Sequence, residues 1–130
     1  MLSLKIMIDV LCAVGAYASV FMYRKSLRAQ AGLVKGDSVV KRPAARLFFG
    51  IPNALFGILF YLALAIVIWF ASAWWWVFIF AAVAAAALTS AYLAYRLLFV
   101  ARATCPYCWT AHAVNWLLAV LTVILFRVAF

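Results

Sequence analysis

The sequence predicts an all-α integral membrane protein, a four-helix bundle that forms one transmembrane domain. Of the 130 residues, 73% are hydrophobic and 10% are charged, and apolar runs long enough to cross a bilayer recur along the chain. A hydrocarbon core of about 30 Å requires roughly 20 helical residues. The chain therefore has the length for four spans and one loop, with nothing left for a second domain.

Four apolar segments define the expected spans. They cover roughly residues 4–23, 47–70, 74–99 and 105–125. A brief Ala-Ser-Ala connection joins the second span to the third, and a short link joins the third to the fourth. We therefore expect each of these pairs to pack as antiparallel neighbours. The intervening residues 24–46 form the longer loop, in which glycines and Pro43 interrupt regular structure.

Basic residues are distributed unevenly between the two ends of this bundle. The loop at residues 24–46 carries seven of the 11 Lys and Arg residues, whereas the opposite end has Lys5 and Arg127. Because cytoplasmic loops accumulate Lys and Arg, we expect a multi-pass cell-membrane protein whose basic loop and Cys105-x-x-Cys108 mouth face the cytoplasm. The net charge of +9 does not predict nucleic-acid binding, because the cations flank apolar spans, where they meet membrane lipid.

Two further features concern the position of the third span in the membrane and the retention of the first. Trp74, Trp75 and Trp76 open the third span, and we expect all three indoles at the membrane interface. Asp9 interrupts the first apolar run, which continues through Met22. We therefore expect this run to be retained as a span, not removed as a signal peptide.

Cys105-Pro106-Tyr107-Cys108 lies at the mouth of the last apolar segment. Steps of three and four residues place Cys105, Cys108, His112 and Asn115 on one helix face. Two thiols at this spacing can close a disulfide, and the positive end of a helix favours the thiolate. A reactive, reversible dithiol is the leading interpretation. Structural cysteines and a soft-metal site that includes His112 are alternatives, and we assign no metal site because the pair offers only two soft ligands.

Several residues have both a functional and a packing interpretation. His112 either contacts whatever Cys108 reacts with or is a packed, hydrogen-bonded residue, and Asn115 suits ordinary hydrogen bonding between helices. Cys12 lies roughly 15 Å below the loop end of the first span, so we expect it only to pack. The proline and glycines between residues 50 and 57 favour either close helix contact or a flat ring lying against the backbone.

Three sequence elements together carry a family resemblance. Gly-Ile-Pro-Asn-Ala-Leu-Phe-Gly opens the second span, Tyr-Leu-Ala-Tyr falls late in the third, and Cys-x-x-Cys is followed by Thr110 and Asn115. In this order and spacing, from about Arg46 to Leu121, the chain resembles the vitamin K epoxide reductase family. The resemblance implies a membrane thiol:quinone oxidoreductase that oxidises a thioredoxin-like partner, reduces a quinone of ubiquinone or menaquinone type, and supports disulfide-bond formation.

The resemblance also implies roles for individual residues. Cys108 would face the quinone, and Cys105 would exchange with the partner's dithiol. The family positions around the quinone match Asn53, Phe56 and Tyr61, and we also expect Trp109 and His112 beside the quinone. Of these, Asn53 would donate a hydrogen bond, Phe56 and Trp109 would form walls, and His112 stands where many members have Tyr.

The chain departs from the family pattern in its first loop. Members normally carry two relay cysteines there, whereas residues 24–46 contain none. Asp37 occupies the position expected for the second relay cysteine, and Pro43 a usual hydroxyl position. Either a partner cysteine attacks Cys105 directly, or the chain is a non-enzymatic membrane subunit that packs with other membrane subunits. The cytoplasmic mouth is a second departure, which resembles inverted members from hyperthermophilic archaea.

Overall fold

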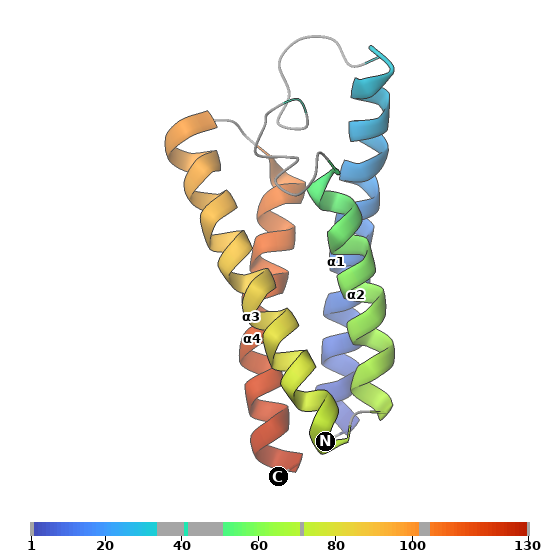
Figure 1. The fold of residues 1–130 in the computed structure, drawn as a ribbon, viewed down its shortest axis with the longest axis vertical. Coiled ribbons are helices and arrows are strands. Elements are labelled where there is room, and N and C mark those ends of the chain that lie inside the picture. Colours follow the sequence, from blue (N-terminus) through green and yellow to red (C-terminus); the bar gives the residue numbers. More distant parts are fainter. Residues whose placement is uncertain (1, 34–40, 42–50, 71, 102–104, 130) are drawn as a thin grey trace.

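A computed structural model of the protein describes residues 2–33, 41, 51–70, 72–101 and 105–129. The described helices are α1 (Leu2–Gln30), α2 (Asn53–Phe70), α3 (Ala73–Tyr95) with its π-helical continuation η3 (Arg96–Ala101), and α4 (Pro106–Ala129). Four of the described helical segments are long and apolar enough to cross a membrane. The predicted all-α four-helix architecture is therefore confirmed, and the chain is a multi-pass membrane protein. Both termini lie at the same end of the bundle (Figure 1).

α1 is longer than the apolar run that predicted it. The helix continues beyond Tyr23 to Gln30, so its last two turns consist of residues that we expected in the loop. Gly32 ends the helix with a φ of 75°, and the amide of Leu33 donates to the carbonyl of Arg28 at 2.9 Å. This is a Schellman closure, in which a glycine takes the left-handed conformation that other residues disfavour.

α2 begins later than predicted, at Asn53. Pro52 precedes the helix instead of interrupting it, and the amide of Leu55 donates to the Pro52 carbonyl at 3.1 Å. A proline here costs no helical hydrogen bond, because amides of the first turn lack an intrahelical acceptor. The first four residues of the predicted span lie outside the described residues, as do Asp37 and Pro43.

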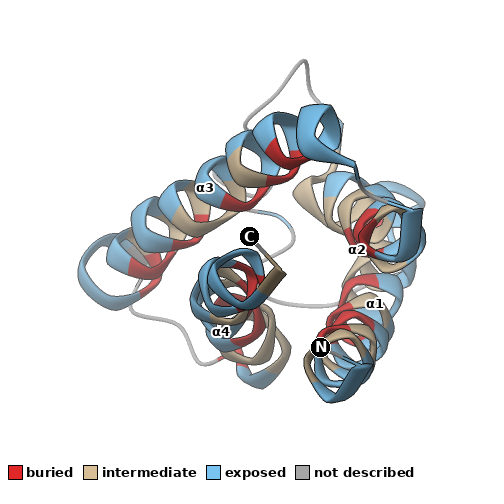
Figure 2. Cartoon of the chain, turned by 90° about the horizontal axis from the view of Figure 1, so that it is seen from below, coloured by how far each residue is buried: buried red, intermediate tan, exposed pale blue. Residues whose placement is uncertain are grey.

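α4 is packed against both α1 and α3, and α1 is packed against α2. By contrast, α2 and α3 touch little and diverge from the turn that joins them (Figures 1 and 2). The prediction that these two helices are packed as neighbours therefore holds only beside their connection. A short turn fixes the distance between two helix ends, but the rest of α3 pairs with α4.

At the end of the bundle that holds the termini, one of the three tryptophans expected at the membrane interface is buried instead. Trp74 is 82% exposed, whereas Trp76 is 5% exposed and its ring lies 5.4 Å from that of Phe126. Trp76 is thus a core residue, because its helical register points it towards α4 and away from the interface. At the same end, the Trp69 indole donates to Asp9 Oδ2 at 2.6 Å, which ties α2 to α1.

Candidate functional site

The cysteine pair forms a disulfide at the start of α4. Pro106 is the first helical residue, a position where its fixed φ is favourable and its missing N–H costs nothing. Cys105 precedes the helix, and its Sγ accepts a hydrogen bond from the Cys108 amide at 3.3 Å. The sulfur therefore lies against the unpaired donors of a helix N-terminus, an environment that favours a thiolate when the disulfide opens.

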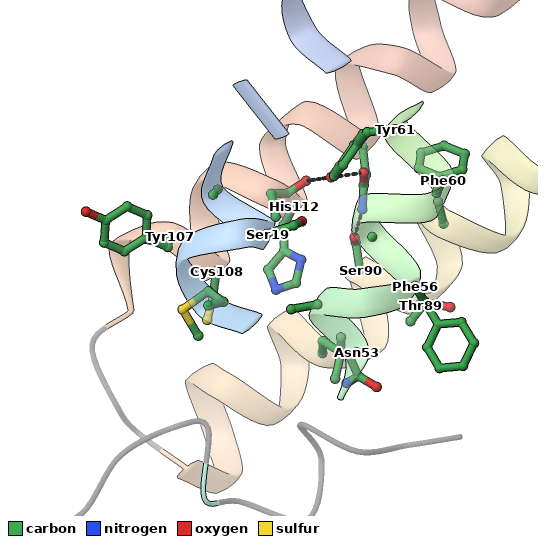
Figure 3. A pocket seen from close by; sticks show the side chains of 18 of the residues that line it. Ser19, Asn53, Phe56, Phe60, Tyr61, Thr89, Ser90, Tyr107, Cys108 and His112 are labelled. Carbon is green, nitrogen blue, oxygen red and sulfur yellow. Dashed lines mark hydrogen bonds between the residues drawn. The ribbon is translucent and has the colours of Figure 1, made fainter. Parts of the chain in front are cut away.

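A cavity of about 380 Å³ lies between the four helices below this disulfide. Cys108 lines it and Cys105 does not, although Cys105 is itself only 6% exposed. The lining is mainly apolar, with a few polar side chains, and the volume falls in the range of small-molecule sites. The polar or aromatic lining residues labelled in Figure 3 are Ser19, Asn53, Phe56, Phe60, Tyr61, Thr89, Ser90, Tyr107 and His112.

One side of the cavity is open between α2 and α3. Ala82 and Ala85 on α3 line the cavity and are also exposed on the surface of the bundle. Phe56 on α2 does the same, with 39% of its surface exposed. In a membrane this surface faces lipid chains, so a lipid-soluble molecule can reach the cavity from the bilayer. The divergence of α2 from α3 creates this opening.

A chain of hydrogen bonds joins three helices at the cavity. The Tyr61 hydroxyl on α2 donates to Asn115 Oδ1 on α4 at 2.6 Å, and Asn115 Nδ2 donates to Ser90 Oγ on α3 at 2.6 Å. Tyr61 is 1% exposed, and its hydroxyl also lies 3.4 Å from the Ala111 carbonyl. Because α2 and α3 hardly touch, this chain is a polar link between them through α4 (Figure 3).

Two glycines leave room for this arrangement. A Cβ at Gly15 would lie 2.5 Å from Cζ of Tyr61, and a Cβ at Gly57 would lie 2.7 Å from Oγ of Ser19. Gly15 on α1 thus lies against the hydroxyl-bearing end of the Tyr61 ring. The sequence marks Gly57 as a site of close approach, and the structure adds Gly15.

Replacing Gly15 with alanine is expected to lower the free energy of unfolding by about 1 to 3 kcal/mol. The added methyl group would displace the Tyr61 ring, whose hydroxyl is hydrogen-bonded to Asn115. Thermal unfolding in detergent would measure the change. Ala13→Leu, which adds atoms at an exposed position of the same helix, should change stability far less. Equal effects of the two substitutions would contradict the packing role of Gly15.

His112 lies one helical turn after Cys108 and lines the same cavity. Its ring contacts Trp109 edge-on, with centroids 5.9 Å apart, and the Trp116 ring centroid lies at 6.1 Å. Its Nδ1 is buried and has no hydrogen-bond partner among the described residues. This residue is 6% exposed, so its polar ring is held among aromatic side chains beside the cavity.

The structure brings together most of the residues that the sequence singled out. Asn53, Phe56, Tyr61, Cys108 and His112 all line the cavity. The expected wall residue, Trp109, is not among the lining residues and instead packs against the ring of His112. Tyr107, within the Cys-x-x-Cys motif, lines the cavity and stacks on Phe21 of α1 with centroids 3.9 Å apart.

Sequence reasoning missed Ser90 and the role of the alanines on α3. The sequence signal for Ser90 was a hydroxyl within an apolar helix, and the structure shows that this residue is buried. Among the described residues, no group of three or more His, Cys, Asp or Glu side chains is placed to hold a metal ion.

A disulfide lies at one rim of a membrane-embedded helical bundle, with one sulfur over an apolar cavity, an arrangement suited to thiol–disulfide chemistry in a membrane. The profile of the Vitamin K epoxide reductase family matches residues 6–123. This match covers nearly the whole chain, so the protein belongs to that family. Members catalyse quinone-coupled thiol redox reactions in the membrane, typically with thioredoxin-like partners. A search of curated proteins found no significant match.

Proposed function

We propose that this protein is a thiol:quinone oxidoreductase that oxidises the dithiol of a thioredoxin-like protein through Cys105 and Cys108 and passes the two electrons to a ubiquinone or menaquinone. The observation that carries the proposal is the placement of the disulfide: Cys108 lines an apolar cavity that opens towards lipid. In this way one sulfur of the pair serves the cavity and the other serves the partner.

In the first half-reaction, a thiolate of the partner attacks Sγ of Cys105, so this residue must become more exposed than the 6% seen in the closed structure. The Cys105–Cys108 bond breaks, a mixed disulfide forms at Cys105, and Cys108 leaves as a thiolate. The second partner thiol then displaces Cys105, so that the partner leaves oxidised and both cysteines are reduced. The helix N-terminus, whose Cys108 amide contacts Sγ of Cys105, stabilises the Cys105 thiolate that is released in the second step.

In the second half-reaction, the cysteines give up two electrons and close their disulfide again. A bound quinone supplies the acceptor for these two electrons and for two protons. Asn53, at the start of α2, donates a hydrogen bond to one quinone oxygen. Phe56 covers one side of the quinone ring. His112, one turn from Cys108, donates a hydrogen bond or passes a proton, and the closed aromatic surroundings keep water away from it.

The absence of cysteine from residues 24–46 requires that the partner reach Cys105 without a relay. The last turns of α1, which carry Arg24, Lys25 and Arg28, lie at the same end of the bundle as the start of α4 (Figure 1). We propose that this end faces the cytoplasm, in accordance with the bias of Lys and Arg towards that side. A partner with acidic residues around its reactive thiol would be attracted to it.

A single-turnover reaction tests the proposal. The reduced protein, in lipid nanodiscs and free of reductant, is mixed anaerobically with a short-chain quinone. We expect one quinol per protein, and of the three cysteines only Cys12 should still react as a thiol after denaturation. Three titratable thiols and no quinol would instead favour the non-enzymatic subunit, for which the missing loop cysteines are the supporting observation.

A further inference from the structure

The hydrogen bonds among Tyr61, Asn115 and Ser90 have a direction. An amide oxygen only accepts hydrogen bonds, and an amide nitrogen only donates them. The Tyr61 hydroxyl donates to Asn115 Oδ1 at 2.6 Å, the shorter of its two contacts, with the Ala111 carbonyl at 3.4 Å. Because Asn115 Nδ2 lies against Ser90 Oγ, Ser90 must be the acceptor. The donors therefore run from α2 through α4 to α3, and the chain ends at the Ser90 hydroxyl hydrogen.

This last hydrogen has no acceptor among the described residues. Ser90 is 2% exposed, and its oxygen is already occupied by Asn115. Serine in a helix often donates to the carbonyl four residues earlier, but Ser90 does not form that bond here. Buried hydroxyl groups are nearly always hydrogen-bonded in proteins. Ser90 also lines the cavity (Figure 3), so its free donor is available to a bound molecule.

We propose that the Ser90 hydroxyl donates a hydrogen bond to a carbonyl oxygen of the ring that occupies the cavity, and that Asn115 and Tyr61 are positioning residues that hold this donor. The inference rests on the proposed function and extends it to the specificity of the same cavity. Asn53 and Ser90 then donate to the two carbonyl oxygens of the ring, which leaves His112 the role of passing a proton. Hydrogen bonds in series polarise one another, so Ser90, which accepts from Asn115, is a better donor than an isolated hydroxyl.

The positions of the two donors suit a small ring with oxygens on opposite edges. Asn53 is the first residue of α2, and Tyr61, which anchors the hydrogen-bonded chain, lies eight residues later on the same helix. Ser90 joins the hydrogen-bonded chain from α3, so the two donors line the cavity from different helices. A ring without oxygens would leave the Ser90 hydroxyl unsatisfied.

Binding of two matched probes tests this inference. The probes are 2-methyl-1,4-naphthoquinone and 2-methylnaphthalene, which share a shape but differ in their carbonyl oxygens. In Ser90→Ala, we expect the Kd and KM of the quinone to rise about tenfold, with a smaller change in kcat, because one hydrogen bond is lost. The Kd of the hydrocarbon should stay within about twofold. Ser90→Thr, which keeps the hydroxyl, should recover most of the quinone affinity.

Two further variants separate a positioning role from a general structural one. Asn115→Ala should raise the quinone Kd as Ser90→Ala does, and the double variant should be no weaker than either alone, because both remove the same donor. Thr122→Val is the control, since Thr122 is a fully buried hydroxyl on α4 that does not line the cavity. This control should leave both Kd values unchanged.

Equal quinone affinity in wild type and Ser90→Ala would overturn the inference, as would an equal loss of affinity for both probes. These results are separable from failure of the proposed function. A wild-type protein that binds the quinone without reducing it, with Ser90→Ala still weakening binding, sinks the oxidoreductase proposal and supports the Ser90 assignment.

Discussion

Replacement of Cys108 with serine is expected to abolish quinone reduction, with a loss of at least about 100-fold in turnover. Cys108 is the cysteine of the pair that lines the cavity, so a hydroxyl in its place cannot give electrons to the ring. The measurement is anaerobic quinol formation with a short-chain quinone and a reduced thioredoxin-like protein. The fold should survive, because the disulfide joins residues only three apart in sequence and constrains the unfolded chain little.

Cys12 supplies the matched control for this experiment. It is the free cysteine of the chain, and it is buried in α1 outside the cavity. Cys12→Ser should keep turnover within about twofold, although burial of the hydroxyl costs some stability. Comparable rates for wild type and Cys108→Ser would contradict the mechanism, and equal losses in both variants would point to a general effect of removing a thiol.

Hydropathy was sufficient to predict the number of spans but not the ends of the helices. The apolar run marks the part of a helix that lies in the membrane, so it could not reveal that α1 continues to Gln30. The true end was signalled by Gly32, whose left-handed conformation closes the helix. Pro52 similarly indicated where α2 begins, because a proline is favoured before or at the first helical turn and disfavoured inside a helix.

The candidate site was predictable where its residues share one helix, and less so where they meet across helices. Cys105, Cys108 and His112 follow helical steps on α4, which a sequence shows directly. The pairing of Ser90 with Asn115 joins residues 25 apart, and the way α3 leans away from α2 decides which of its faces lines the cavity. That divergence depends on the packing of α3 against α4, which the length of a turn does not reveal.

The opening between α2 and α3 is expected to hold the tail of a prenylated quinone, and Ala85→Phe should close it. Ala85 lines the cavity and is exposed, so a large ring there would occupy the path of the tail and leave the space around Cys108 intact. The ring acts by blocking the entry and seating of the tail, because lipid is as apolar as the opening and the tail gains no hydrophobic transfer energy there. We expect kcat/KM for a prenylated quinone to fall about tenfold, because the quinone ring is then misplaced relative to Cys108.

A quinone without a tail should react with Ala85→Phe within about twofold of the wild-type rate, because it does not use the opening. Ala84→Phe is the control: it places the same ring at an exposed position of α3 that does not line the cavity. If Ala85→Phe slowed both quinones equally, the substitution would be disturbing the ring site itself, and the tail would have to leave by another route. A selective loss for the prenylated quinone, absent in Ala84→Phe, would show that the bilayer supplies the substrate through the gap that α3 leaves beside α2.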